Sequence, residues 1–144
     1  MLYGANARDL DRLQSIQHKA VKLIHSAGRR ESPSPLMHNL HWLPIRDRIK
    51  FKICMYVYKC LQGNAPQYLC VLLSHREIPS TGCRTRSSKD TTLLRARVGK
   101  KCIGDKSFCV AAPSLWNSLP RNIREALSLH SFKKMLKCHL YPEC

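Results

Sequence analysis

The side chains of this chain that could do chemistry are above all its cations. Lysine and arginine number 25 against 9 aspartates and glutamates, which gives a formal net charge of +16. An excess of that size favours an anionic partner, and nucleic acid is the commonest one for a basic domain. An anionic membrane surface is the rival, but no apolar run approaches the roughly 18–20 residues of a spanning helix. The composition therefore predicts a nucleic-acid partner and no membrane partner.

The acidic residues lack the pattern that metal-assisted phosphate chemistry requires. Two metal ions need closely placed carboxylates, yet the acids are scattered and no adjacent Asp-Asp pair occurs. Asp9 and Asp11 would lie about 160° apart on a helix of 3.6 residues per turn. The sequence also has no Gly-rich phosphate loop and no His-Glu-x-x-His run. We therefore expect no catalytic residues and no cofactor.

The cysteines raise the question of disulfides, since the chain has 8 of them. Cys54, Cys60 and Cys70 fall inside apolar helical patterns, and a free cysteine often serves as a small buried apolar residue. No secretory signal opens the sequence, so an intracellular location, cytoplasmic or nuclear, is expected. Free thiols are the expectation in such a reducing compartment.

A zinc site is not expected at the C-terminal end of the sequence. Zinc knuckles need four ligands that include a close Cys-x-x-Cys pair, and no such pair occurs. Cys138 and His139 are adjacent, so they would point to different sides of a helix. With Cys144 they do not complete a ligand set.

The candidate nucleic-acid-binding residues are cations that gather on helix faces or in the basic middle of the chain. Their contacts would go to phosphates, which give affinity without sequence choice. They are Arg8, Arg12, Lys19, Lys22, Arg29, Arg30, Arg84, Arg86, Lys100, Lys101, Lys133, Lys134 and Lys137. Three further cations, Arg48, Lys52 and Lys59, form a narrow strip on one helix, where a solvated edge is the simpler interpretation.

The elements that position these residues are predicted to be helices. The expected fold class is mainly α: a small irregular helical domain with a basic, loop-rich middle segment. Helices are predicted over residues 8–27, 45–61, 66–74 and 128–141. The helix over 45–61 is bounded by Pro44 and Gly63. Because it is apolar on two sides, we expect it to be buried between its neighbours. Ser128 or Ser131 is expected to cap the last helix.

The first predicted helix is amphipathic. Its basic half faces one way and its apolar half the other. We expect the apolar half, including Leu13 and Ile16, to face the core. Gly28 is expected to end the helix.

Two later segments are predicted with less regular structure. Residues 31–44 should form a connector with a short turn of helix, in which Trp42 packs on the long helix; base stacking is the alternative role for this side chain. Pro113 suits a helix start and Pro120 a helix end. Trp116 and Leu119 are expected to dock on the first helices.

Four segments of the sequence carry a resemblance. They read LHWLPIRDRIKFKI, YKCLQGNAPQYLCVLL, FCVAAPSLWNSLPRNIR and SFKKMLKCHLY. In this order and spacing they resemble the C-terminal end of the reverse transcriptase polyprotein of non-LTR (LINE-type) retrotransposons of animals. The upstream piece LDRLQSIQHKAVKLI is similar to the thumb helix of the same polyproteins. Composition and resemblance together predict a thumb-like helical region over 1–75, a basic flexible linker over 76–106 and a C-terminal helical segment over 107–144.

The resemblance implies a partner but no polymerase activity. Thumb helices of polymerases lie along the template–primer duplex, which implies an RNA or RNA–DNA duplex backbone as partner and the palm domain as a second partner. The palm residues have no counterpart here. The expected function is therefore that of a reverse transcriptase fragment acting as a sequence-tolerant nucleic-acid-binding helical module. Two alternatives stay open: a degenerate transposon-derived open reading frame without selected function, and a small enzyme with a cryptic Cys/His site.

Overall fold

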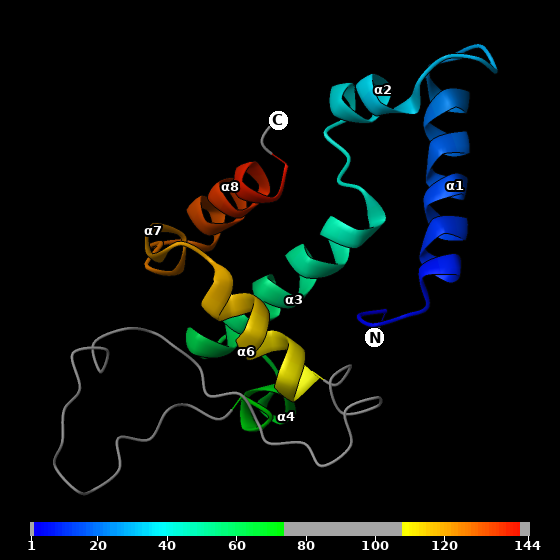
Figure 1. The fold of residues 1–144 in the computed structure, drawn as a ribbon. Coiled ribbons are helices and arrows are strands. Elements are labelled where there is room, and N and C mark those ends of the chain that lie inside the picture. Colours follow the sequence, from blue (N-terminus) through cyan, green and yellow to red (C-terminus); the bar gives the residue numbers. More distant parts are fainter. Residues whose placement is uncertain (1, 74–107, 142–144) are drawn as a thin grey trace, which may run out of the picture.

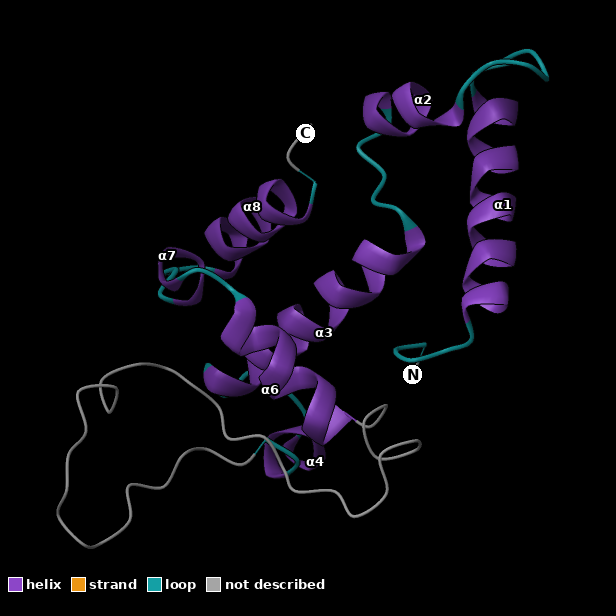
Figure 2. Ribbon diagram, in the orientation of Figure 1, coloured by secondary structure: helices purple, strands orange, loops and turns teal. Residues whose placement is uncertain are grey.

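The computed structural model describes residues 2–73 and 108–141, and these are mainly helical (Figure 1). The seven helices of this part are α1 (Ala7–Ile24), α2 (Pro33–Asn39), α3 (Ile45–Leu61), α4 (Gln67–Val71), α6 (Phe108–Ser118), α7 (Arg121–Arg124) and α8 (Leu129–Leu140). No strand occurs among the described residues (Figure 2). The expected mainly α fold is confirmed. The predicted linker over 76–106 lies outside the described residues.

Helix α3 is the element on which four of the other helices pack. Its bounds, Ile45–Leu61, are those predicted from the sequence. It contacts α1, α4, α6 and α8, and Figure 1 shows α1 and α8 on either side of it. The buried residues of α3 are Ile53, Cys54, Val57, Tyr58 and Cys60. The expectation that this helix is buried between neighbours is confirmed.

The main core joins α3 to α6 and α8 through aromatic side chains. Trp116 and Phe132 are both fully buried, and their ring centroids lie 5.8 Å apart. Phe132 also stacks on Tyr58 at 4.4 Å, and the Tyr58 hydroxyl donates a hydrogen bond of 2.9 Å to the carbonyl of Ala126. Leu119 belongs to the same cluster. The expected docking of Trp116 and Leu119 on a preceding helix is thus seen, on α3.

Three helices end in the same hydrogen-bond pattern. After α3, Gly63 has a φ of 70°. The N–H of Gly63 donates to the carbonyl of Cys60, and the N–H of Asn64 donates to the carbonyl of Lys59. The same pair of bonds closes α1 around Ser26 and α2 around His41, whose φ values are 50° and 52°. A non-glycine residue in this left-handed region is strained by roughly 1–2 kcal/mol.

Helix α1 therefore ends earlier than predicted. It stops at Ile24, and Ser26 takes the terminating role that the sequence assigned to Gly28. The reason is that the N–H of Ala27 already bonds to the carbonyl of Lys22, so the last carbonyls of the helix are satisfied before the chain reaches the glycine.

The apolar half of α1 is only partly buried, which corrects the sequence prediction. Ile16 is 61% exposed and Leu23 is 81% exposed, while Leu13 is half-buried. The buried residues of α1 are instead Gln17 and Val21. The packed side of the helix is thus rotated away from the centre of its apolar half.

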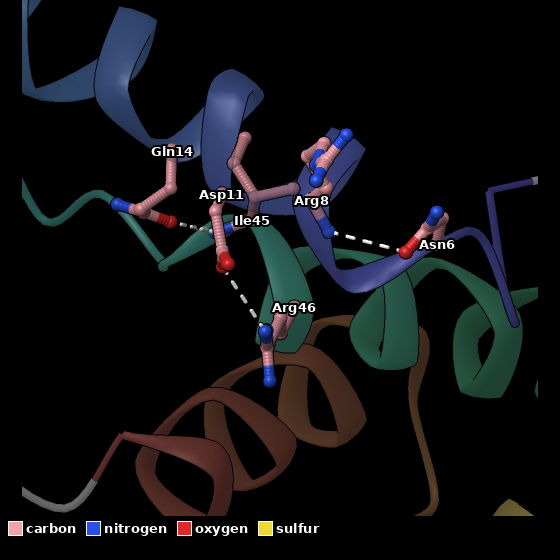
Figure 3. Close-up of polar contacts among 6 residues, drawn as sticks. All are labelled: Asn6, Arg8, Asp11, Gln14, Ile45 and Arg46. Carbon is pink, nitrogen blue, oxygen red and sulfur yellow. Dashed lines mark hydrogen bonds and ion pairs between the residues drawn. The ribbon is translucent and has the colours of Figure 1, made fainter.

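Two glutamines account for this rotation. Gln17 donates a hydrogen bond of 2.9 Å from Nε2 to the carbonyl of Leu43. Gln14 accepts one of 2.8 Å at Oε1 from the N–H of Ile45. Figure 3 shows the second bond beside the ion pair between Asp11 of α1 and Arg46 in the first turn of α3. Because these contacts hold backbone groups at the start of α3, the glutamine side of α1 faces the rest of the protein.

Proline placement also differs from the prediction in α6. Pro113 lies inside this helix rather than at its start. An interior proline removes one hydrogen bond and costs about 3 kcal/mol. Val110, Ala111 and Ala112, which precede it, are all buried, so core packing outweighs the local preference. The predicted helix end is confirmed, because α6 ends at Ser118, shortly before Pro120. Pro120 is then the N-cap residue of α7.

The connector over 31–44 contains more helix than expected. Helix α2 holds its prolines in the first turn, where backbone N–H groups have no partner within the helix. Trp42 is half-buried and packs against the small cluster of Val21, Leu36 and Met37. The sequence predicted packing on the long helix, whereas the residues of this cluster come from α1 and α2. At the other end of the chain, Ser128 is the expected cap of α8, since its Oγ accepts the N–H of Ser131 at 3.1 Å.

Candidate nucleic-acid interface

The predicted basic side of α1 is open to solvent. Arg8, Arg12 and Lys19 are exposed, and Lys22 is half-buried. Lys22 donates from Nζ to the carbonyl of Arg29 at 2.9 Å, so it holds the loop that follows the helix. With 3.6 residues per turn, this basic side lies roughly opposite the side of α1 that packs on the protein.

The other predicted cations lie on separate surfaces or outside the described part. Arg29 and Arg30 are exposed after α1, and Lys133 and Lys134 are exposed on α8. Helices α1 and α8, which carry most of the described cations of this set, lie on either side of α3 (Figure 1). The residues of this set outside the described ranges are Arg84, Arg86, Lys100 and Lys101.

The structure brings Lys137 together with two cations that the sequence assigned to a solvated edge. Arg48 and Lys52 from α3 and Lys137 from α8 line one open hollow of about 330 Å³. The rest of its wall consists of His41, Trp42, Leu43 and Phe51. We call this site the basic hollow. None of the described aspartates or glutamates lines it.

Three segments build the basic hollow. Arg48 and Lys52 are four residues apart on α3, so they lie on one side of that helix one turn apart. Lys137 comes from the last turn of α8, which packs on α3. The third segment is the turn after α2, where the left-handed backbone of His41 directs the chain to Trp42.

The described carboxylates are used elsewhere, mostly in ion pairs at the surface. These pairs are Arg46–Asp11 at 3.1 Å, Lys50–Asp47 at 3.0 Å, Arg121–Glu125 at 2.7 Å and Arg12–Asp9 at 3.9 Å. Exposed pairs of this kind add little stability. They matter here because these carboxylates lie away from the basic hollow. No described carboxylate therefore offsets its three cations.

Two of the described cysteines, Cys54 and Cys60, do not have the properties of a nucleophile. Burial raises the pKa of the Cys54 thiol from 9.0 to about 12. Burial, with a contribution from the neighbouring Cys70, raises the pKa of Cys60 to about 11. A catalytic cysteine needs the opposite shift, because the thiolate is the reactive form. Cys54, Cys60, Cys70 and Cys138 are free thiols.

The described residues hold neither a group of metal ligands nor a membrane-spanning helix. Among them, no group of three or more histidines, cysteines, aspartates or glutamates is placed to hold a metal ion. Cys144 of the C-terminal triple lies outside the described ranges. None of the described helices is both long enough and apolar enough to cross a membrane.

Comparison with known proteins gives no match: no family model, no curated protein and no solved structure matches this chain. A functional interpretation therefore depends on the geometry of the site and on the order of the sequence motifs.

Sequence reasoning identified Lys137 but missed the other two cations of the basic hollow. The available signal was the four-residue spacing of Arg48 and Lys52, with Trp42 a few residues before them. That signal is weak by itself, because charged residues at this spacing are common on solvated helix edges. Only the packing of α8 on α3 makes the three cations one site.

Proposed function

We propose that this chain is a sequence-tolerant nucleic-acid-binding helical module and that it corresponds to the thumb and post-thumb region of a non-LTR retrotransposon reverse transcriptase. The observation that carries the proposal is the convergence of Arg48, Lys52 and Lys137 on one hollow without a described carboxylate. The net charge of +16 supports the same class of partner.

The three cations of the basic hollow repel one another. Like charges held near one another are destabilising unless an anion lies between them, so phosphate oxygens would bind favourably at this site. Contacts to phosphates position a nucleic acid but carry no sequence information. The proposed binding is therefore tolerant of sequence and sensitive to salt.

The exposed cations of α1 extend this proposal to a second surface. Arg8, Arg12 and Lys19 face solvent on the side of α1 away from the protein, and Arg29 and Arg30 continue this surface beyond the helix. Lys133 and Lys134 are exposed on α8, which lies across α3 from α1 (Figure 1). A long duplex or folded RNA would contact one of these surfaces along its backbone.

An uncovered apolar surface supports the proposal that a further domain packs on this module. A groove of about 330 Å³ between α1 and α3 is lined by Leu2, Leu13, Ile45, Arg48, Ile49, Lys52, Ile53 and Tyr56. The exposed side chains of Ile16 and Leu23 lie on the adjoining helix α1. Exposed apolar patches of this kind often mark interaction sites. In a protein of the proposed kind, the palm is the partner we assign to it.

The test is a binding isotherm on random-sequence duplexes of RNA, DNA and RNA–DNA hybrid at several salt concentrations. The log of the binding constant should fall linearly with log salt, by roughly 0.7–0.9 for each phosphate contact. Circular dichroism of the same sample establishes that it is folded. Binding that ignores salt, or that requires one sequence, would contradict the proposal. No binding by a folded sample would favour the degenerate open reading frame.

A further inference from the structure

The basic hollow combines two features that a backbone-binding surface does not need together. It is concave and holds three cations, and its wall also contains Trp42 and Phe51. We infer that the basic hollow binds an unpaired nucleotide, with its base against the aromatic wall and its phosphates against Arg48, Lys52 and Lys137. This inference rests on the proposed function and adds to it a preference for single strands.

The shape of the site argues for an unpaired nucleotide rather than a duplex. The phosphates of a duplex would reach cations at the rim, but paired bases are stacked inside the double helix and cannot enter a hollow. An unpaired base is free to leave its neighbours and lie on an aromatic side chain. The volume of about 330 Å³ falls in the range of small-ligand pockets.

The aromatic wall has a supported position. Trp42 packs against the cluster of Val21, Leu36 and Met37, and it also borders the hollow. An aromatic side chain held in this way loses little freedom when a base stacks on it. Stacking is tolerant of sequence because every base has a π-face, so the site would fit the sequence-tolerant binding proposed above.

Tryptophan emission gives a direct readout of the inference. The chain has 2 tryptophans, and Trp116 is fully buried in the main core, so a change caused by a stacked base arises at Trp42. A 12-nucleotide oligothymidylate should quench this emission, and a 12-base-pair duplex should not. Trp42→Phe serves as the blank. Trp42→Leu should weaken binding of the single strand roughly fivefold to a hundredfold and leave duplex binding within about twofold.

A matched pair of lysine variants keeps the test valid if Trp42→Leu fails to fold. Lys52 and Lys50 lie on the same helix, but only Lys52 lines the hollow, and Lys50 is paired with Asp47. Lys52→Ala should weaken single-strand binding more than Lys50→Ala does, although both remove one charge. Equal losses would overturn the inference.

The outcomes separate this inference from the proposed function. If single strands and duplexes both bind, without quenching and without a selective effect of Trp42→Leu, the inference is overturned and the proposed function stands. If inorganic phosphate competes as well as a mononucleotide, the aromatic wall has no role and the inference is again overturned. If a folded sample binds neither nucleic acid, both fail.

Discussion

Gly63→Ala should destabilise the protein through the backbone alone. Gly63 has a φ of 70°, and a Cβ added there would meet no atom within 4 Å. A steric clash is thus excluded, and the penalty is the left-handed conformation itself, roughly 1–2 kcal/mol for an L-residue. Part of this penalty is offset, because alanine lowers the conformational entropy of the unfolded chain. That effect stabilises the folded protein by about 0.4–1 kcal/mol.

Gly28→Ala is the matched control. A Cβ at Gly28 also meets nothing within 4 Å, and its φ is not in the left-handed region. The unfolded-chain effect is the same for both variants, so it cancels in their difference. Urea unfolding followed by circular dichroism should therefore place Gly63→Ala roughly 1–2 kcal/mol below Gly28→Ala in stability. Equal stabilities would refute the assignment of Gly63 as the residue that ends α3.

Three further predictions test the core and the orientation of α1. Tyr58→Phe should lower the free energy of unfolding by about 1–3 kcal/mol in a denaturant titration, because it leaves a buried carbonyl without its donor; an unchanged value would contradict the 2.9 Å bond. At pH 7.5, mass spectrometry should find exposed Cys138 alkylated well before buried Cys54. Burial raises the pKa of Cys54 to about 12, which leaves less of the reactive thiolate. Comparable alkylation rates would contradict the burial of Cys54. Ile16→Ser should change the free energy of unfolding by less than about 0.5 kcal/mol in thermal unfolding. Val21→Ala should lower it by about 2 kcal/mol. The reverse order would restore the prediction that Ile16 faces the core.

The central helix could be predicted from the sequence because local signals and burial agree there. Pro44 begins the segment, Gly63 supplies the residue that ends it, and the apolar residues between them cover more than one side. The cap of α8 at Ser128 was predictable for the same reason. In both places the local preference of the chain and its tertiary packing favour the same structure.

The orientation of α1 could not be predicted, because hydrophobic periodicity identifies an apolar side but not its neighbour. The packed side is set by hydrogen bonds from Gln14 and Gln17 to backbone groups of Ile45 and Leu43. Those bonds depend on the path of the chain between α2 and α3. A sequence pattern counts glutamine as polar and therefore places it on the outside.

The candidate site was predictable only in part, because its residues come from distant segments. Lys137 stood out as part of a basic helix face, but Arg48 and Lys52 looked like an ordinary charged edge of α3. Their convergence depends on the packing of α8 against α3. The half-burial of Trp42 likewise follows from its position between the small cluster and the hollow.

The most direct test of the central claim compares two charge-matched triple variants in the salt dependence of nucleic-acid binding. The first replaces the hollow cations Arg48, Lys52 and Lys137 with glutamine. The second replaces three cations that are already ion-paired, which are Arg46, Lys50 and Arg121. Both lose the same charge, and circular dichroism verifies that both are folded.

The predicted result is that the hollow variant flattens the log–log salt slope by roughly 2–3, at about 0.7–0.9 for each lost phosphate contact. The ion-paired variant should flatten it by less than about 1, because its cations are already neutralised by carboxylates. Equal slopes for the two variants would contradict the account. Binding would then follow net charge alone, and the basic hollow would not be the nucleic-acid site.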